Sequence, residues 1–88
     1  MRVKIKYFAS IREALGMDEE SVDTRATTVG ALRDELIARG GAHAQALART
    51  RDGKSRAVRA ALDQRMSTED AALREGCEVA FFPPVTGG

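Results

Sequence analysis

The sequence has little of what disulfides, metal sites and membrane spans require. Its 88 residues include one cysteine, Cys77, and one histidine, His43. These two side chains exclude an internal disulfide framework and a four-ligand zinc site built on Cys and His. No run of about 18 apolar residues occurs, and the first residues, MRVKIKYFAS, lack the apolar stretch of a signal peptide. We therefore expect a soluble, cytoplasmic protein that binds no metal and no membrane.

An excess of one sign of charge is also missing. Fourteen Lys and Arg residues face thirteen Asp and Glu residues, which gives a net charge of +1. Because phosphate binding needs a concentrated basic excess, this balance argues against nucleic acid as the main partner. A hydrophobic fraction of 43% in 88 residues is typical of one compact globular domain.

Alternation of apolar and polar residues predicts the strands. The period of two is clear over residues 3–7, 58–62 and 78–82, and weaker patterns predict short strands over 19–23 and 65–67. In the last strand, Val79 and Phe81 share one face, while Ala80 and Phe82 share the other. Only one of the two phenylalanines can therefore face the core.

The longest helix is predicted over residues 29–39. Val29, Leu32 and Leu36 place one apolar stripe along it, and Thr28 is a suitable N-cap. One main helix packed on one face of a mixed sheet is the simplest way to bury that stripe, so the fold class is α+β.

Two shorter helices are predicted beside it, over residues 10–15 and 42–48. In the first, Ser10 and Glu13 have the spacing of a capping box, in which each side chain bonds a free amide of the first turn. In the second, Leu47 is the expected core residue.

The end of the sequence is its most informative feature. Pro83 and Pro84 end the last strand and favour an extended, stiff exit from the domain. Gly87 and Gly88 then form a thread without side chains, which fits a narrow channel and leaves the terminal carbonyl open to attack. We therefore divide the chain into a domain of residues 1–82 and an extended tail of residues 83–88.

Other residues that could carry chemistry have ordinary structural interpretations. Cys77 is expected to be a buried apolar residue, although it could relay sulfur. His43 is expected to decorate a helix, and the acidic pairs and runs are expected to be solvated. The acidic residues are Asp18, Glu19, Glu20, Asp34 and Glu35, and a basic cluster that could contact an acidic surface comprises Arg49, Arg51, Lys54, Arg56 and Arg59.

Residues 76–88, GCEVAFFPPVTGG, resemble the carboxyl-terminal signature of the small subunit of molybdopterin synthase, the MoaD type. Phe8-Ala9 with Arg12-Glu13, and Thr28-Val29 with Ala31 to Arg33, extend the resemblance over nearly the whole chain. Asp63 stands where that family usually has Asn, and Cys77 where it usually has a polar or acidic residue.

The resemblance implies a ubiquitin-like β-grasp fold and a sulfur-carrier function. An adenylating enzyme would activate the carboxylate of Gly88 with ATP and magnesium, and a sulfurtransferase would supply the sulfur that replaces AMP to give a thiocarboxylate. Gly87 would give access to it. The chain would thus be the sulfur-donating subunit of an enzyme whose catalytic side chains lie on the large subunit, in a heterotetramer of two small and two large subunits. Its substrate would be cyclic pyranopterin monophosphate, which receives the two sulfurs of the dithiolene.

Partner binding is expected at the exit of the last strand. The exposed phenylalanine and the residues after it would contact the large subunit, because aromatic side chains dominate interface energies. The predicted contact residues are Phe82, Pro83, Pro84, Val85 and Thr86.

Two other functions remain open at this point. A carrier of sulfur for thiamine or another thiolated product also ends in Gly-Gly. A ubiquitin-like protein modifier, or a docking module without chemistry, is the alternative from a different functional class.

Overall fold

The computed structural model of the chain describes residues 1–48 and 58–83. The predicted order of elements is confirmed within these residues. In chain order the elements are β1 (Arg2–Tyr7), α1 (Ala9–Leu15), β2 (Glu19–Asp23), α2 (Val29–Ala38), α3 (Gly41–Leu47), β3 (Arg59–Leu62), β4 (Arg65–Ser67) and β5 (Glu78–Phe82).

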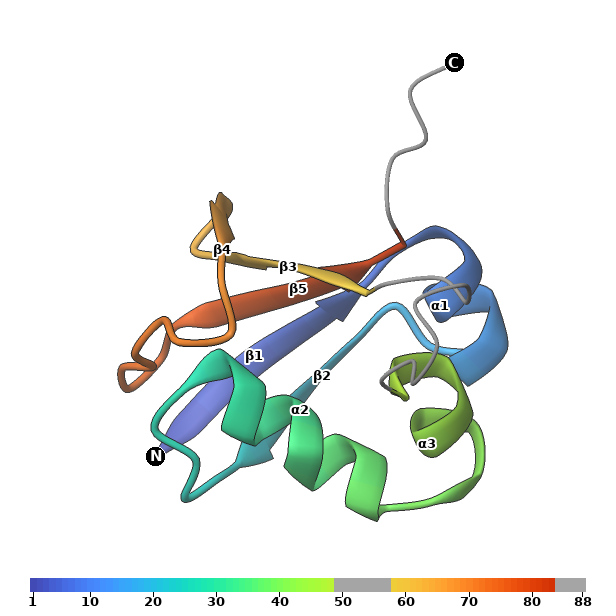
Figure 1. Cartoon of the computed structure of the whole chain (residues 1–88), viewed down its shortest axis with the longest axis horizontal. Coiled ribbons are helices and arrows are strands. Elements are labelled where there is room, and N and C mark those ends of the chain that lie inside the picture. Colours follow the sequence, from blue (N-terminus) through green and yellow to red (C-terminus); the bar gives the residue numbers. More distant parts are fainter. Residues whose placement is uncertain (49–57, 84–88) are drawn as a thin grey trace.

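One mixed sheet of five strands organises the fold, in the order β2-β1-β5-β3-β4. The central pair, β1 and β5, is parallel, and the other three pairs are antiparallel. Figure 1 shows α2 lying across the sheet, with α1 and α3 together at one end of it. The predicted α+β class, with one main helix on a mixed sheet, is confirmed.

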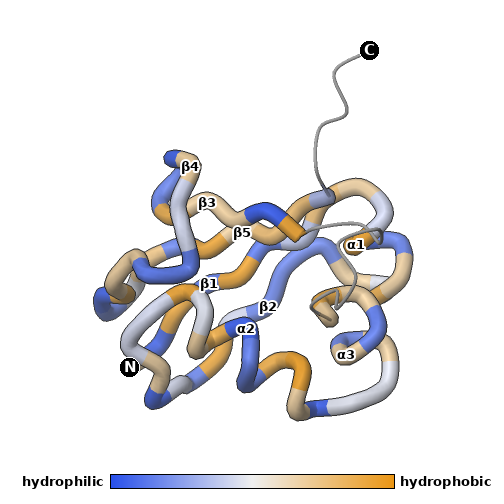
Figure 2. The backbone as a smooth tube through the Cα atoms, in the orientation of Figure 1, coloured by the Kyte–Doolittle hydropathy of each residue, from blue (hydrophilic) through white to orange (hydrophobic). Residues whose placement is uncertain are grey.

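The core lies between the helices and one face of the sheet. Because directly paired residues share a face, the register places Ile5 and Tyr7 beside Val79 and Phe81. The alternation along β1 is visible as alternating hydropathy in Figure 2. Every helix contributes to the same cluster, whose members include Val3, Ile5, Tyr7, Ile11, Val29, Leu32, Leu36, Leu47, Val79 and Phe81.

The predicted capping box of α1 is wrong. The N-cap is Phe8, whose carbonyl oxygen accepts from the amides of Ile11 (3.1 Å) and Arg12 (3.3 Å), and no side chain caps the helix. Ser10 lies inside the first turn. The reason is that the amide of Phe8 still donates to the carbonyl of Phe81 at 3.1 Å, and Ala9, with φ of 52°, turns the chain directly into the helix.

The predicted cap of α2 is confirmed, since the hydroxyl of Thr28 accepts from the amide of Ala31 at 3.2 Å. The helix ends at Ala38, one residue earlier than predicted, with Arg39 as its C-cap. Its first amides have further partners in the segment before β5: Gly30 N donates to the carbonyl of Glu69 at 2.9 Å.

The turn between β3 and β4 uses an unusual residue pair. Asp63 and Gln64 have φ of 49° and 69°, as a two-residue hairpin turn demands. The Asp63 carboxylate accepts from the amide of Glu78 at 2.9 Å and from the guanidinium of Arg74 at 2.7 Å. The Glu78 amide first, and then Arg74, lower the pKa of Asp63. The carboxylate at this position thus joins the turn to the start of β5.

We predict that Gly30→Ala lowers the free energy of unfolding by about 1 kcal/mol. Alanine favours helix, but its Cβ would lie 3.0 Å from the Cβ of Glu69 and 3.2 Å from its carbonyl oxygen, so the segment bonded to Gly30 must move. Urea unfolding of both chains measures the difference. A variant as stable as the parent, or more stable, would show that this close approach is not tight.

Candidate functional site

The candidate site lies on the outer face of the sheet, the side opposite the helices. Register defines its members: Glu78, Ala80 and Phe82 of β5 point outward together with the residues paired to them. These paired residues are Lys4 and Lys6 of β1, Ala61 and Arg59 of β3 and, beyond Ala61, Met66 of β4.

One half of the outer face, over β2 and β1, carries charges that pair with one another. Three cations of β1 each lie close to a carboxylate of a neighbouring strand. The pairs are Arg2–Asp23 (3.3 Å), Lys4–Glu19 (3.5 Å) and Lys6–Glu78 (3.6 Å). Such exposed pairs contribute little stability, but they leave this half electrically balanced.

The other half carries what we call the apolar patch: Phe8, Ala61, Met66, Ala80 and Phe82. Phe82 is half-buried, whereas 44% of Phe8 and 59% of Met66 are exposed. The backbone of Phe8 is still extended, so its side chain points to the side opposite the buried Tyr7, which is the outer face. Large exposed apolar side chains gathered on one face are typical of a protein–protein interface.

The predicted assignment of the two phenylalanines is confirmed. Phe81 is 1% exposed in the core, and Phe82 faces the other side, where Pro83 follows it and is also half-buried. Of the other predicted partner-binding and catalytic residues, Pro84, Val85, Thr86, Gly87 and Gly88 lie outside the described residues.

Sequence reasoning missed Phe8 and Met66. Alternation in β1 places Phe8 on the same side as Lys4 and Lys6, so its outward position could have been read from the pattern. Met66 could not, because its place opposite Ala61 depends on the β3–β4 register.

Two of the residues considered for chemistry belong to a cluster on the helical side. Glu20 was expected to be solvated, and this prediction is wrong. The Tyr7 hydroxyl donates to it at 2.7 Å and the Arg39 guanidinium at 2.9 Å, while His43 Nε2 lies 3.0 Å from the same carboxylate. His43 thus joins α3 to the sheet rather than only decorating a helix.

The electrostatics of this cluster follow from its hydrogen bonds. Burial alone would raise the pKa of Glu20, but hydrogen bonds from His43, Tyr7 and Arg39 outweigh it and lower the pKa to about 2. Burial, followed by the hydrogen bond to Glu20, raises the pKa of Tyr7, so its phenol remains a donor. Glu20 is therefore a structural acceptor and not a proton carrier.

Cys77 is 4% exposed in the core, as expected of a buried apolar residue. Within residues 1–48 and 58–83, no three His, Cys, Asp or Glu side chains gather in a way that could hold a metal ion. No helix in this described part is long and apolar enough to cross a membrane.

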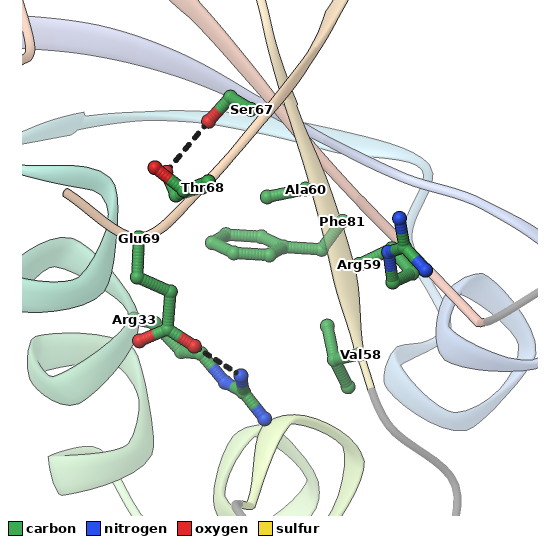
Figure 3. Close-up of a pocket in the computed structure, with 8 residues that line it drawn as sticks. All are labelled: Arg33, Val58, Arg59, Ala60, Ser67, Thr68, Glu69 and Phe81. Atoms are coloured by element: carbon green, nitrogen blue, oxygen red, sulfur yellow. Dashed lines mark hydrogen bonds and ion pairs between the residues drawn. The ribbon is translucent and has the colours of Figure 1, made fainter. Parts of the chain in front are cut away.

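A pocket of about 220 Å³ opens on the helical side of β3, with Phe81, Val58 and Ala60 among its lining residues (Figure 3). At its edge the buried guanidinium of Arg33 donates to Glu69 at 2.8 Å and to the carbonyl of Leu47 at 2.7 Å. These bonds fasten the end of α3 to α2, so Arg33 and Glu69 serve the fold.

Known proteins resemble this chain in sequence and in fold. The pattern of the ThiS family matches residues 5–88. The molybdopterin synthase sulfur carrier subunit of Escherichia coli is 43% identical, over 98% of this chain and 99% of its own length.

Solved structures show the same fold. A putative molybdopterin converting factor, subunit 1, from Pyrococcus furiosus is 30% identical, with a TM-score of 0.72 and coverage of 97% of this chain and 99% of that one. Small archaeal modifier protein 1 from Haloferax volcanii is 27% identical, with a TM-score of 0.71 and coverage of 96% and 98%. The expected ubiquitin-like β-grasp fold is confirmed.

We predict that Glu20→Gln removes a pH-dependent contribution to stability. The pKa of Glu20 is lowered on folding, so its contribution is complete above pH about 5 and disappears as the pH falls toward 2. The variant should be less stable by about 1–2 kcal/mol at neutral pH, after allowance for solvent screening, and as stable as the parent near pH 2. Urea unfolding between pH 7 and pH 2 measures the difference.

Glu19→Gln is the matched control, because within the described part of the chain the ion pair of Glu19 is with Lys4, at 3.5 Å on the exposed face. It should change stability by less than about 0.5 kcal/mol at any pH. If the two variants had equal effects, the cluster around Glu20 would not be the source of the acid sensitivity.

Proposed function

Because the chain belongs to the ThiS family, we propose that it is the sulfur-carrier subunit of a molybdopterin synthase. Two observations support this function. The first is the 43% identity with the sulfur carrier subunit of Escherichia coli over nearly the whole of both chains. The second is the sequence FFPPVTGG over residues 81–88, whose first two residues end the central strand of the sheet.

The proposed reactive group is the carboxylate of Gly88. An activating enzyme with ATP and magnesium converts it to an acyl-adenylate and releases pyrophosphate, which changes a poor electrophile into a good one. Sulfur that a sulfurtransferase supplies, reduced by a thiol to the level of sulfide, then displaces AMP and leaves a thiocarboxylate. We place this step in the cytoplasm, where ATP is available to the activating enzyme.

The thiocarboxylate would donate its sulfur inside the large subunit. Its anionic sulfur forms a C–S bond to cyclic pyranopterin monophosphate as a C–O bond at the same carbon breaks and the oxygen group leaves. Water then cleaves the bond between the acyl carbon and sulfur, which leaves sulfur on the pterin and restores the carboxylate of Gly88. Two such transfers supply the two sulfurs of the dithiolene. The sulfur is already nucleophilic, so this chain needs no side-chain base, and Gly87 leaves the reacting carbonyl unobstructed.

The fold supports this function through the position of β5. This strand has neighbours on both sides, β1 and β3, and it ends at Phe82. The end of β5 at Phe82 therefore lies in the middle of the sheet rather than at an edge. We propose that the large subunit covers the apolar patch there and receives residues 83–88, in a heterotetramer of two small and two large subunits.

A protein modifier is the second candidate, because the fold is shared with small archaeal modifier protein 1 at 27% identity. The two functions use the same activated carboxylate and differ in what attacks it. A lysine amine would give an isopeptide, whereas sulfur gives a thiocarboxylate.

We predict that incubation of the chain with its activating enzyme, ATP and a sulfur donor gives an oxygen-to-sulfur mass gain confined to Gly88. Mass spectrometry of the carboxyl-terminal peptide measures it. Deletion of Gly88 should abolish sulfur transfer to the pterin while thermal unfolding stays the same. Isopeptide-linked products without the sulfur adduct would instead support the modifier, and an unmodified terminus would contradict both.

We also predict that Phe82→Asp weakens binding to the large subunit at least about tenfold, because a charge would be buried in the interface. Because Phe82 is half-buried, Phe82→Asp could also destabilise the free chain, so Met66→Asp is a second test. Met66 is 59% exposed, and an aspartate there should leave the free chain folded. Calorimetric titration measures binding, and thermal unfolding verifies the fold.

Gln45→Glu, on the exposed side of α3, adds one negative charge on the opposite side of the molecule and should bind like the parent. Equal binding by Phe82→Asp, Met66→Asp and the parent would exclude the apolar patch as the interface.

A further inference from the structure

Arg59 is placed differently from the other cations of the outer face. It is the first residue of β3, it is exposed, and it pairs across the strands with Phe82. Arg59 is one of the residues at the pocket, but in Figure 3 its guanidinium extends to the opposite side of the β3 ribbon from the side chain of Ala60. The guanidinium thus lies on the outer face, at the border of the apolar patch.

The cations of β1 have counter-charges on neighbouring strands, whereas Arg59 has none among residues 1–48 and 58–83. Arg2, Lys4 and Lys6 each have a carboxylate within 3.6 Å. The part of the chain that the structure describes provides no such carboxylate for Arg59. Its outward-facing neighbours on the adjacent strands include Phe82, Ala80 and Met66. None of these three side chains carries a carboxylate.

This arrangement has a consequence for binding. If a partner covers the apolar patch, the guanidinium of Arg59 loses water at the rim of the contact. A charge that loses water without a counter-charge opposes binding, whereas a guanidinium that meets a carboxylate can form two parallel hydrogen bonds. The apolar patch and Arg59 are therefore complementary to a surface that has an apolar centre and a carboxylate at its edge.

We infer that Arg59 determines partner specificity by pairing with an Asp or Glu side chain of the synthase large subunit, at the edge of the surface that covers the apolar patch. This inference rests on the proposed function. It adds to the proposed function a statement about the partner's surface, which has an acidic side chain next to an apolar area. The charge pair steers association and fixes the orientation in which residues 83–88 enter the large subunit.

The test compares Arg59→Ala with Arg65→Ala. Both variants remove one exposed arginine from neighbouring strands, but Arg65 pairs with Leu62 and so lies on the other side of the sheet. Association and dissociation rates with the large subunit are measured by surface plasmon resonance at several salt concentrations. The full-length chain and purified large subunit are used throughout.

Arg59→Ala should weaken binding about tenfold, mainly through slower association, and should make the affinity less dependent on salt. Arg59→Glu should weaken it further, and Arg59→Lys should recover part of the loss, because the charge returns without the planar geometry. Arg65→Ala should bind within about twofold of the parent. Thermal unfolding of each variant verifies that the domain remains folded.

Other results would contradict the inference in distinct ways. If Arg59→Ala bound as tightly as the parent, the charge pair would be excluded while the sulfur-carrier function stood. An equal loss in Arg59→Ala and Arg65→Ala would show a general effect of net charge and would also overturn the specific pair. If the parent chain itself failed to bind the large subunit, the proposed function would be wrong, and the inference with it.

Discussion

The parallel pairing of β1 with β5 is the constraint on which the rest of the structure depends. It sets Tyr7 opposite Phe81 and continues to the amide of Phe8, which donates to the carbonyl of Phe81 at 3.1 Å. Because side chains alternate along a strand, this register fixes Phe81 inside and Phe82 outside, and a slip of one residue would exchange them. The same pairing places the end of β5 in the middle of the sheet.

The two faces of the sheet differ in what they contact. The helices cover one face and bury a continuous core, whose polar border is held by groups such as Arg33 and Glu20. The outer face divides between charges that pair within the chain and an apolar patch at the exit of β5. Stability is thereby supplied by one side of the sheet, and the other side remains available for a partner.

Much of this could be predicted from the sequence, because the signals concerned are local. Alternation located the strands and assigned Phe81 and Phe82 to opposite faces, and Thr28 marked the start of the main helix. The capping box failed because the chain turns at Ala9, directly after the long-range bond from the Phe8 amide to the Phe81 carbonyl, so the helix begins before Ser10. The positions of Met66 and of the partners of Glu20 also depend on residues far apart in the sequence. Strand register places Met66 opposite Ala61, and helix packing brings Arg39 and His43 to Glu20. The roles proposed for Gly87 and Gly88 are based on the sequence and the family alone.

The most direct test of the account follows labelled sulfur. The chain is prepared as a thiocarboxylate with isotopically labelled sulfur at Gly88, combined with the large subunit and cyclic pyranopterin monophosphate, and the pterin product is analysed by mass spectrometry. The account predicts that both dithiolene sulfurs carry the label and that the chain returns to its carboxylate form. Unlabelled product formed while the thiocarboxylate stays intact would contradict it.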